Sequence, residues 1–202
     1  MPQIRVLRLE YRYQSDRRIS THLGLVARAF GASELLVAGN KRDVAAGREI
    51  RLLKETEKLK ESLTEVCKVW GGEKFKVNYI PDWKTFLIKE KELGVKIAHL
   101  TMFGLPIIEQ LKTIKEAQKC NSSWIVVVGG AKVPKKLYQL ADFNISITLQ
   151  PHSEVAALAI FLNKFYDDYW LGIDIPFKDA TVKIIPSSKE KITRPKRPDS
   201  SF

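Results

Sequence analysis

The fold is constrained most by the regular alternation of short apolar runs with segments whose apolar residues recur at helical spacing. The apolar runs predict strands near 4–9, 35–38, 75–79, 95–100, 125–128 and 144–149. The helical spacing predicts helices near 20–31, 44–70, 81–87, 106–114 and 153–165. Because strand and helix alternate, we expect an α/β fold with a parallel sheet, forming one domain over residues 1–170.

Residues 171–202 differ in composition and are predicted to form a C-terminal extension. Over residues 178–202 there are seven Lys or Arg against three acidic residues, together with three prolines and four serines. This composition predicts one short strand over 182–185 and a disordered basic end. Two alternatives stay open for the extension, which either contacts RNA phosphates or is simply solvated.

The chain as a whole carries a large excess of positive charge. It contains 34 Lys or Arg and 23 Asp or Glu, which gives a formal net charge of +11. We therefore expect a polyanionic partner, nucleic acid above all, because neutralising phosphates releases counterions. The alternative is a generally basic, well-solvated surface.

Other features bear on location and on metal binding. No apolar run is long enough to span a bilayer, and the basic start leads directly into a strand, so we expect a cytoplasmic protein without a membrane partner. Cys67 and Cys120 form no CxxC motif and have no metal-ligand spacing with the three histidines, so we expect no metal site. Both cysteines lie near predicted helix ends and are expected to pack as small apolar side chains.

Two segments in the second half of the chain locate the expected binding crevice. Residues 125–134 and 144–157 each predict an apolar strand that ends in a polar or glycine loop and then enters a helix. Neighbouring strand ends of this kind form a crevice where α/β proteins bind small molecules. Gly129 and Gly130 would let a ligand approach the backbone, although a tight turn is the simpler interpretation. Residues 101–104 are expected as a third loop on the same crevice.

Charged and imidazole side chains near these loops are candidates for chemistry. Residues 16–18, Asp-Arg-Arg, follow the first strand. Adjacent arginines at a sheet end suit a phosphate or a developing oxyanion, although a charge run is more often a solvated surface. His22 and His152 lie near expected helix starts and are candidate site residues. His99 lies within a strand, where a histidine is more often a hydrogen-bonded core residue.

The motifs of the chain, taken in order, resemble those of one family. They are Asp-Arg-Arg-Ile-Ser-Thr-His at 16–22, Val-Ala-Arg-Ala-Phe-Gly-Ala at 26–32, His-Leu-Thr-Met-Phe-Gly at 99–104, Val-Gly-Gly-Ala-Lys-Val-Pro at 128–134 and Gln-Pro-His-Ser-Glu-Val-Ala-Ala-Leu at 150–158. This set resembles the archaeal tRNA (cytidine-56)-2′-O-methyltransferases of the SPOUT class. The resemblance implies S-adenosyl-L-methionine held in a deep C-terminal trefoil knot, a homodimer with sites at its interface, and the T-arm of tRNA as substrate.

The resemblance also assigns roles to residues. Arg18 matches the family's catalytic arginine, with His22 and His152 as candidate catalytic partners. The implied cofactor contacts are Leu100, Thr101, Val128, Gly129, Gly130, Ala131, Lys132, Val133, Ser146, Ile147, Thr148, Leu149, Gln150, Pro151, His152 and Ser153. This sequence has Leu149 where the family usually has asparagine, which removes an amide side chain beside the cofactor loop. Ser153 is also expected as a helix N-cap.

The implied reaction is attack of a ribose 2′-hydroxyl on the methyl group of the cofactor. Arginine stays protonated in proteins, so Arg18 is expected to stabilise the developing alkoxide or to hold the adjacent phosphate. A histidine is then expected to accept the proton. Two other interpretations are kept: a non-catalytic basic α/β protein that binds RNA, and a nucleotide-binding enzyme. The second is weakened because neither a GxGxxG nor a P-loop pattern occurs.

Overall fold

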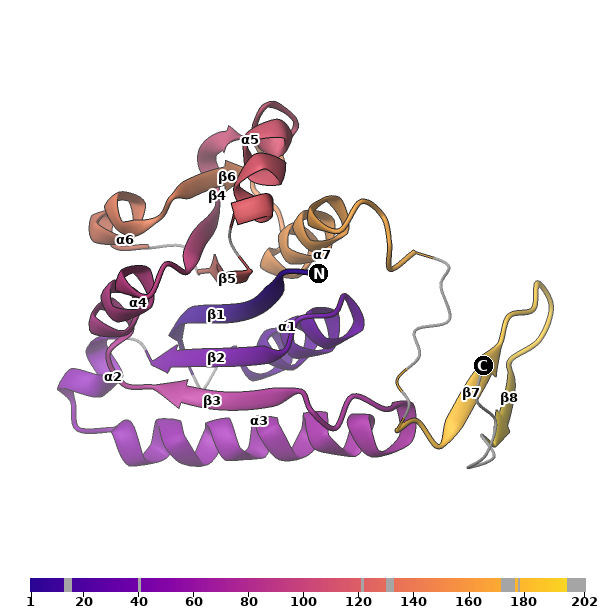
Figure 1. Cartoon of the computed structure of the whole chain (residues 1–202). Coiled ribbons are helices and arrows are strands. Elements are labelled where there is room, and N and C mark those ends of the chain that lie inside the picture. The colour runs from indigo at the N-terminus through magenta and orange to yellow at the C-terminus, as the bar shows by residue number, and fades with distance from the viewer. Residues whose placement is uncertain are drawn as a thin grey trace.

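The computed structural model describes residues 1–12, 16–39, 41–120, 122–129, 133–171, 177 and 179–195. Within them, six strands form a sheet in the order β3-β2-β1-β5-β4-β6, and every neighbouring pair is parallel (Figure 1). The strands are β1 (Gln3–Tyr11), β2 (Glu34–Gly39), β3 (Lys76–Ile80), β4 (Lys96–Pro106), β5 (Ser123–Val128) and β6 (Phe143–Ser146). The helices are α1 (Arg17–Ala29), α2 (Lys41–Ala45), α3 (Glu49–Trp70), α4 (Trp83–Glu92), α5 (Ile107–Cys120), α6 (Lys135–Leu140) and α7 (Glu154–Phe165). The predicted parallel α/β sheet is confirmed.

Helices cover both faces of this sheet, which explains why strands such as β2 and β5 are nearly continuous apolar runs. Successive side chains of a strand point to opposite faces. Ile4 and Val6 of β1 therefore belong to the core shared with α1, α3, α5 and α7, and Leu7 and Leu9 to the core shared with α4 and α6. All four side chains are fully buried. A parallel strand that is buried on both faces has the nearly continuous apolar sequence seen in β5.

Several helix boundaries differ from those predicted. Helices α4 and α5 end at Glu92 and Cys120 rather than near residues 87 and 114. Helix α1 begins at Arg17 rather than near residue 20, with Asp16 in the N-cap position. The single helix predicted over 44–70 is wrong, because α2 and α3 are separated by a turn that contains Gly47 with a φ of 69°. Glycine adopts this left-handed conformation without steric cost. Apolar spacing continues across the turn, so periodicity alone does not reveal it.

The loop predicted over 101–104 is also wrong, because β4 continues as extended chain to Pro106. Its register against β6 is irregular there, since Leu100 and Leu105 both lie opposite Ile145. A Cβ added to Gly104 would lie 2.5 Å from the backbone carbonyl of Asn144. Glycine is therefore what allows the backbones of β4 and β6 to approach so closely at this point.

After α7 the chain leaves the sheet and forms a separate hairpin. The strand predicted over 182–185 is confirmed as β7 (Val182–Ile185), which pairs antiparallel with β8 (Ile192–Pro195), a strand that the sequence did not predict. The hairpin stands apart from the main sheet, beyond the C-terminal end of α3 (Figure 1). The predicted basic end from residue 196 onward lies outside the described residues.

The cysteines give one confirmed and one wrong prediction. Cys67 is buried near the end of α3, whereas Cys120, the last residue of α5, is exposed. Cys120 does not lie on the buried side of α5, where Ile107 and Ile114 pack, so the prediction that it packs as a small apolar side chain is wrong. In the part of the chain described by the structure, no helix combines the length and the apolar character needed to cross a membrane.

Candidate functional site

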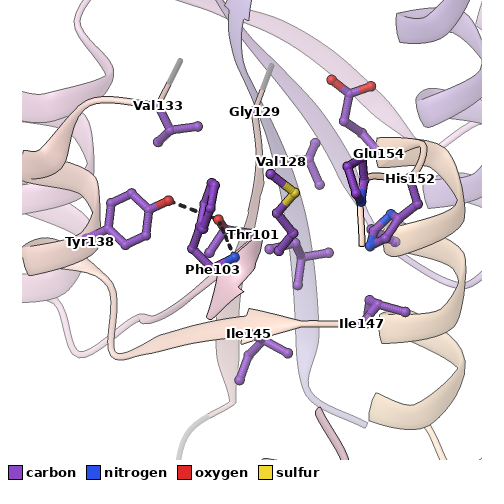
Figure 2. Close-up of a pocket in the computed structure, with 14 residues that line it drawn as sticks. Thr101, Phe103, Val128, Gly129, Val133, Tyr138, Ile145, Ile147, His152 and Glu154 are labelled. Atoms are coloured by element: carbon purple, nitrogen blue, oxygen red, sulfur yellow. Dashed lines mark hydrogen bonds between the residues drawn. The ribbon is translucent and has the colours of Figure 1, made fainter. Parts of the chain in front are cut away.

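A cavity of about 370 Å³ opens at the carboxyl ends of β4, β5 and β6 (Figure 2). It is lined by Leu100, Thr101, Met102, Phe103, Val128, Gly129, Val133, Tyr138, Ile145, Ile147, Pro151, His152, Glu154 and Ala157. The three chain segments expected around a crevice thus surround one cavity. The expectation that the ends of β5 and β6 are direct neighbours is wrong, because β4 lies between these strands.

Gly129 shapes the wall at the end of β5. A Cβ at this position would lie 2.6 Å from Cγ2 of Val133, much closer than carbon atoms approach in folded proteins. Val133 can therefore fold back over the strand end because residue 129 has no side chain. Both residues line the cavity. Gly130, Ala131 and Lys132, between them, lie outside the described residues.

Hydrogen bonds join β4, β6 and α6 on one side of the cavity. The Thr101 Oγ1 lies 2.9 Å from the Tyr138 hydroxyl and accepts from the Phe103 backbone N–H at 3.3 Å (Figure 2). Asn144 donates from Nδ2 to the Tyr138 carbonyl at 2.9 Å, and its Oδ1 lies 2.8 Å from His99 Nδ1. An amide oxygen only accepts, so in this arrangement the His99 Nδ1 carries a proton.

His99 supports this wall from behind. The side chain is fully buried, and burial lowers the pKa of its imidazole, while the hydrogen bond to Asn144 acts in the opposite direction. The Tyr138 ring packs edge-on against it, with 4.8 Å between ring centroids. His99 is not among the lining residues. The expectation that it is a core residue is confirmed, with Nδ1 hydrogen-bonded, whereas its buried Nε2 has no hydrogen-bond partner among the described residues.

The other side of the cavity carries a buried ion cluster that the sequence analysis missed. The Arg8 side chain, 1% exposed, donates to Glu154 at 3.1 Å and to Asp16 at 3.4 Å. Glu154 lines the cavity as the first residue of α7 (Figure 2), and Asp16 precedes α1. Asp16 also accepts from the exposed Arg12 at 2.9 Å. Arg8 therefore ties the start of α1 to the cavity wall.

The start of α7 presents polar groups to the cavity. Ser153 is the N-cap of this helix, as predicted, because its Oγ accepts from the Val155 N–H at 3.2 Å. The turn before it places Pro151 and His152 on the lining. His152 Nδ1 lies 3.1 Å from the Ser153 carbonyl, which fixes the orientation of the ring.

The implied cofactor contacts within the described residues fall into three groups. Those that line the cavity are Leu100, Thr101, Val128, Gly129, Val133, Ile147, Pro151 and His152. Ser146 lies behind the lining and is buried, and its Oγ has no hydrogen-bond partner within the described ranges. Those that are exposed outside the lining are Thr148, Leu149, Gln150 and Ser153.

Arg18 and His22 lie outside the cavity. Both are exposed on α1, four residues apart on the same side of the helix, and neither lines the cavity of its own chain. Lining residues that are not among the implied cofactor contacts are Met102, Phe103, Tyr138, Ile145, Glu154 and Ala157. All but Tyr138 fall in the segments 101–104 and 144–157 that were expected around the crevice. As far as the structure describes the lining, it includes no Arg or Lys side chain.

Comparisons with known proteins show the family of the chain. Residues 70–194 match the model of the family described as tRNA ribose 2′-O-methyltransferase, aTrm56. A tRNA (cytidine(56)-2′-O)-methyltransferase of Thermococcus kodakarensis is 40% identical over 188 residues, which cover 93% of this chain and 94% of that protein. The chain belongs to this family. The aTrm56 relative of Methanothermobacter thermautotrophicus, which has the same description, is 39% identical over 95% of this chain and 96% of its own.

Solved structures of SpoU methyltransferases have the same fold as this chain. The TrmH/SpoU tRNA modifying enzyme of A. aeolicus superposes with a TM-score of 0.54 at 15% identity, over 83% of this chain and 75% of that one. The SpoU methyltransferase AviRb of Streptomyces viridochromogenes, solved with AdoMet, superposes with a TM-score of 0.51 at 12% identity, over 84% and 58% of the two chains. The chain therefore has the SpoU methyltransferase fold.

Proposed function

We propose that this chain transfers a methyl group from S-adenosyl-L-methionine to the 2′-hydroxyl of cytidine 56 in the T-loop of tRNA. The observation that carries the proposal is the cavity at the ends of β4, β5 and β6, which the family motifs of this chain surround. The relatives at 40% and 39% identity are named for this reaction. The net charge of +11 suits a polyanionic substrate. As a tRNA-modifying enzyme, the protein works in the cytoplasm.

The cavity fits the cofactor in size and in chemistry. Its volume of about 370 Å³ lies within the range of small-molecule sites. Aliphatic side chains at the strand ends suit an adenine ring, and the hydroxyls of Thr101 and Tyr138 and the carboxylate of Glu154 suit polar groups of the ligand. When bound, the cofactor supplies an electrophilic methyl group on a sulfonium.

Arg18 is the proposed catalytic arginine, and its position supports a homodimer. It is exposed on α1, while the described lining of its own cavity contains no cationic side chain. We infer that Arg18 of one subunit completes the cavity of the other, with the cofactor loop held in a trefoil knot. A guanidinium stays protonated and offers several N–H donors, which suits stabilisation of the alkoxide that forms as the ribose hydroxyl loses its proton.

His152 is the proposed proton acceptor. It is the imidazole that lines the cavity, and a general base must lie within hydrogen-bond reach of the proton it removes. His22 shares a side of α1 with Arg18 and enters the site with it in the proposed dimer. Leu149 is exposed away from the lining, so the loss of an amide at this position leaves the proposed cofactor contacts of the cavity intact.

The reaction is tested with unmodified tRNA and labelled S-adenosyl-L-methionine, followed by mapping of the 2′-O-methyl group. We expect a single modified nucleotide, cytidine 56. The Arg18→Ala variant is expected to lose methyl transfer while it keeps its cofactor affinity within about threefold, because the proposed role of Arg18 is to stabilise the ribose alkoxide rather than to bind the cofactor. Normal turnover by this variant contradicts the assignment of Arg18.

The dimer is tested by mixing two inactive variants. Gly129→Val fills the cavity of one subunit, and Arg18→Ala removes the arginine from the other. If Arg18 acts across the interface, each mixed dimer has one intact site, and random mixing restores about a quarter of the normal activity. If Arg18 acts within its own chain, mixing restores none.

The competing interpretation is a basic RNA-binding protein without catalysis. It predicts that calorimetry with S-adenosyl-L-methionine gives no heat, and that the demethylated product does not compete. We expect instead saturable binding that Gly129→Val abolishes and Leu149→Ala leaves unchanged, since only the first position lines the cavity.

A further inference from the structure

The β7–β8 hairpin, which we call the basic hairpin (residues 182–195), concentrates positive charge. Its charged residues are Lys183, Lys189, Glu190, Lys191 and Arg194. Lys189, Lys191 and Arg194 are exposed to solvent. Four cations against one acid in so short an element make this the part of the extension best suited to a polyanion.

The residues just before the hairpin attach it to the end of α3. Arg28 of α1 is 7% exposed, and its Nε donates to the Gly71 carbonyl at 3.0 Å. The same guanidinium lies over the Phe177 ring, 4.7 Å from its centroid. A Cβ on Gly71, whose φ is 79°, would lie 2.3 Å from Cβ of Phe177. Glycine is therefore required for this close packing as well as for the backbone conformation.

Two further hydrogen bonds continue the attachment. Asp179 accepts from the Glu73 N–H at 2.6 Å, and the Thr181 N–H donates to the Val69 carbonyl at 3.0 Å. Thr181 immediately precedes β7. The hairpin therefore leaves the end of α3 from a fixed point rather than from a free linker.

The cations of the hairpin are held in defined positions. Lys183 and Arg194 lie opposite each other in the antiparallel ladder, which places both on one face. At the tip, Ser187 Oγ accepts from the Lys189 N–H at 3.2 Å and orders the turn. Charges on an ordered element bind a partner with a smaller loss of conformational entropy than charges on a mobile tail.

The hairpin and the cavity lie at opposite ends of the strands of the sheet. The cavity is at the carboxyl ends of the strands, whereas the hairpin adjoins the end of α3, from which the chain enters the amino end of β3 (Figure 1). With six residues at about 3.3 Å each, β5 separates these two ends by about 20 Å. A ligand that contacts both places on one chain is therefore a macromolecule.

We propose that the basic hairpin is a second tRNA-binding surface, which holds the phosphate backbone at a distance from the methylated nucleotide. The proposal rests on the proposed function, because that function supplies tRNA as the substrate. A polyanion is favoured over the hairpin of a second copy of this chain, since two elements that each carry four cations and one acid repel each other. The exposed Ile184, at 59%, offers an apolar contact to a ribose or base beside the phosphates.

The test removes charge from the hairpin and measures tRNA binding as a function of salt. The variant is Lys189→Gln, Lys191→Gln and Arg194→Gln combined. Each lost phosphate contact lowers the slope of log affinity against log salt by about 0.7 to 0.9, so three contacts lower it by about 2. We expect this smaller salt slope together with a higher KM for tRNA. The kcat at saturating tRNA and the affinity for S-adenosyl-L-methionine are expected to stay unchanged.

A matched control removes the same charge elsewhere. Lys89, Lys112 and Lys119 are exposed on α4 and α5, and their combined replacement by glutamine is expected to change the salt slope by less than about 1. Equal slopes for the two triple variants overturn the proposal. A hairpin variant that becomes monomeric by light scattering also overturns it, in favour of self-association. A chain that binds tRNA through the hairpin but transfers no methyl group refutes the proposed function and leaves the hairpin proposal standing.

Discussion

Replacing Arg8 with methionine removes the cation that joins the start of α1 to the cavity wall. The Arg8 side chain is 1% exposed, and its partners Asp16 and Glu154 are 4% and 25% exposed. Methionine fills much of the same volume, so the main loss is electrostatic. Breaking a buried ion pair by removing one partner costs about 3–5 kcal/mol, because the other charge stays buried without compensation.

The expected cost lies at the lower end of that range. Asp16 keeps its bond to Arg12 at 2.9 Å and accepts from the Arg12 backbone N–H at 3.2 Å, and Glu154 is partly solvated. We therefore expect the Arg8→Met variant to lose about 3 kcal/mol of unfolding free energy. With a urea m-value of about 2 kcal/mol per molar, the unfolding midpoint falls by about 1.5 M.

Arg12→Met is the matched control for this prediction. Arg12 contacts the same carboxylate but is 63% exposed, so its removal is expected to cost about 1 kcal/mol or less. A double-mutant cycle that combines Arg8→Met with Asp16→Asn measures the interaction between these two residues, and a coupling free energy above about 1 kcal/mol is expected. If Arg8→Met is no less stable than Arg12→Met, the buried cluster does not support this wall and the reasoning is refuted.

Three further predictions concern the cavity. Burial lowers the pKa of His99 in the folded protein, so the stability that its neutral imidazole contributes is present above the unfolded-state pKa of about 6.5 and is lost as the pH falls below that value. Urea unfolding on either side of this pH should show that the His99→Gln variant loses less unfolding free energy on acidification than the original protein. Gly129→Ala places a Cβ 2.6 Å from Val133, which should weaken S-adenosyl-L-methionine binding about tenfold by calorimetry. Leu149→Asn, on an exposed side chain, should change the same affinity by less than about twofold.

The sheet and the place of the cavity were predictable because they follow from local patterns. Residues 125–128 form an uninterrupted apolar run before a glycine, which is typical of a buried parallel strand end. Strand order is a different matter, because the position of β4 between β5 and β6 depends on contacts between distant segments. The turn at Gly47 is hidden by a local pattern, because the apolar residues before and after it continue the same helical spacing.

Residues of the site were predictable only where they lie at the end of a predicted strand or in the residues that follow it. Arg8 was missed as a partner of Glu154, although an arginine within an apolar strand signals a buried charge that needs a counterion. The carboxylate that supplies this counterion can be identified only from the tertiary structure, because Arg8 and Glu154 are 146 positions apart in the sequence. Tyr138 was missed because its hydroxyl reaches the cavity through a short helix with no motif of its own.

The first strand of the chain lies between β2 and β5 in the finished sheet. During synthesis, β1 can pair with β2 early, but its other edge waits until residues 123–128 have left the ribosome. Until then a strand with fully buried side chains such as Ile4 and Leu7 presents unpaired backbone groups. We therefore expect truncated chains that end before β5 to aggregate or to bind chaperones, and to become soluble once β5 is included.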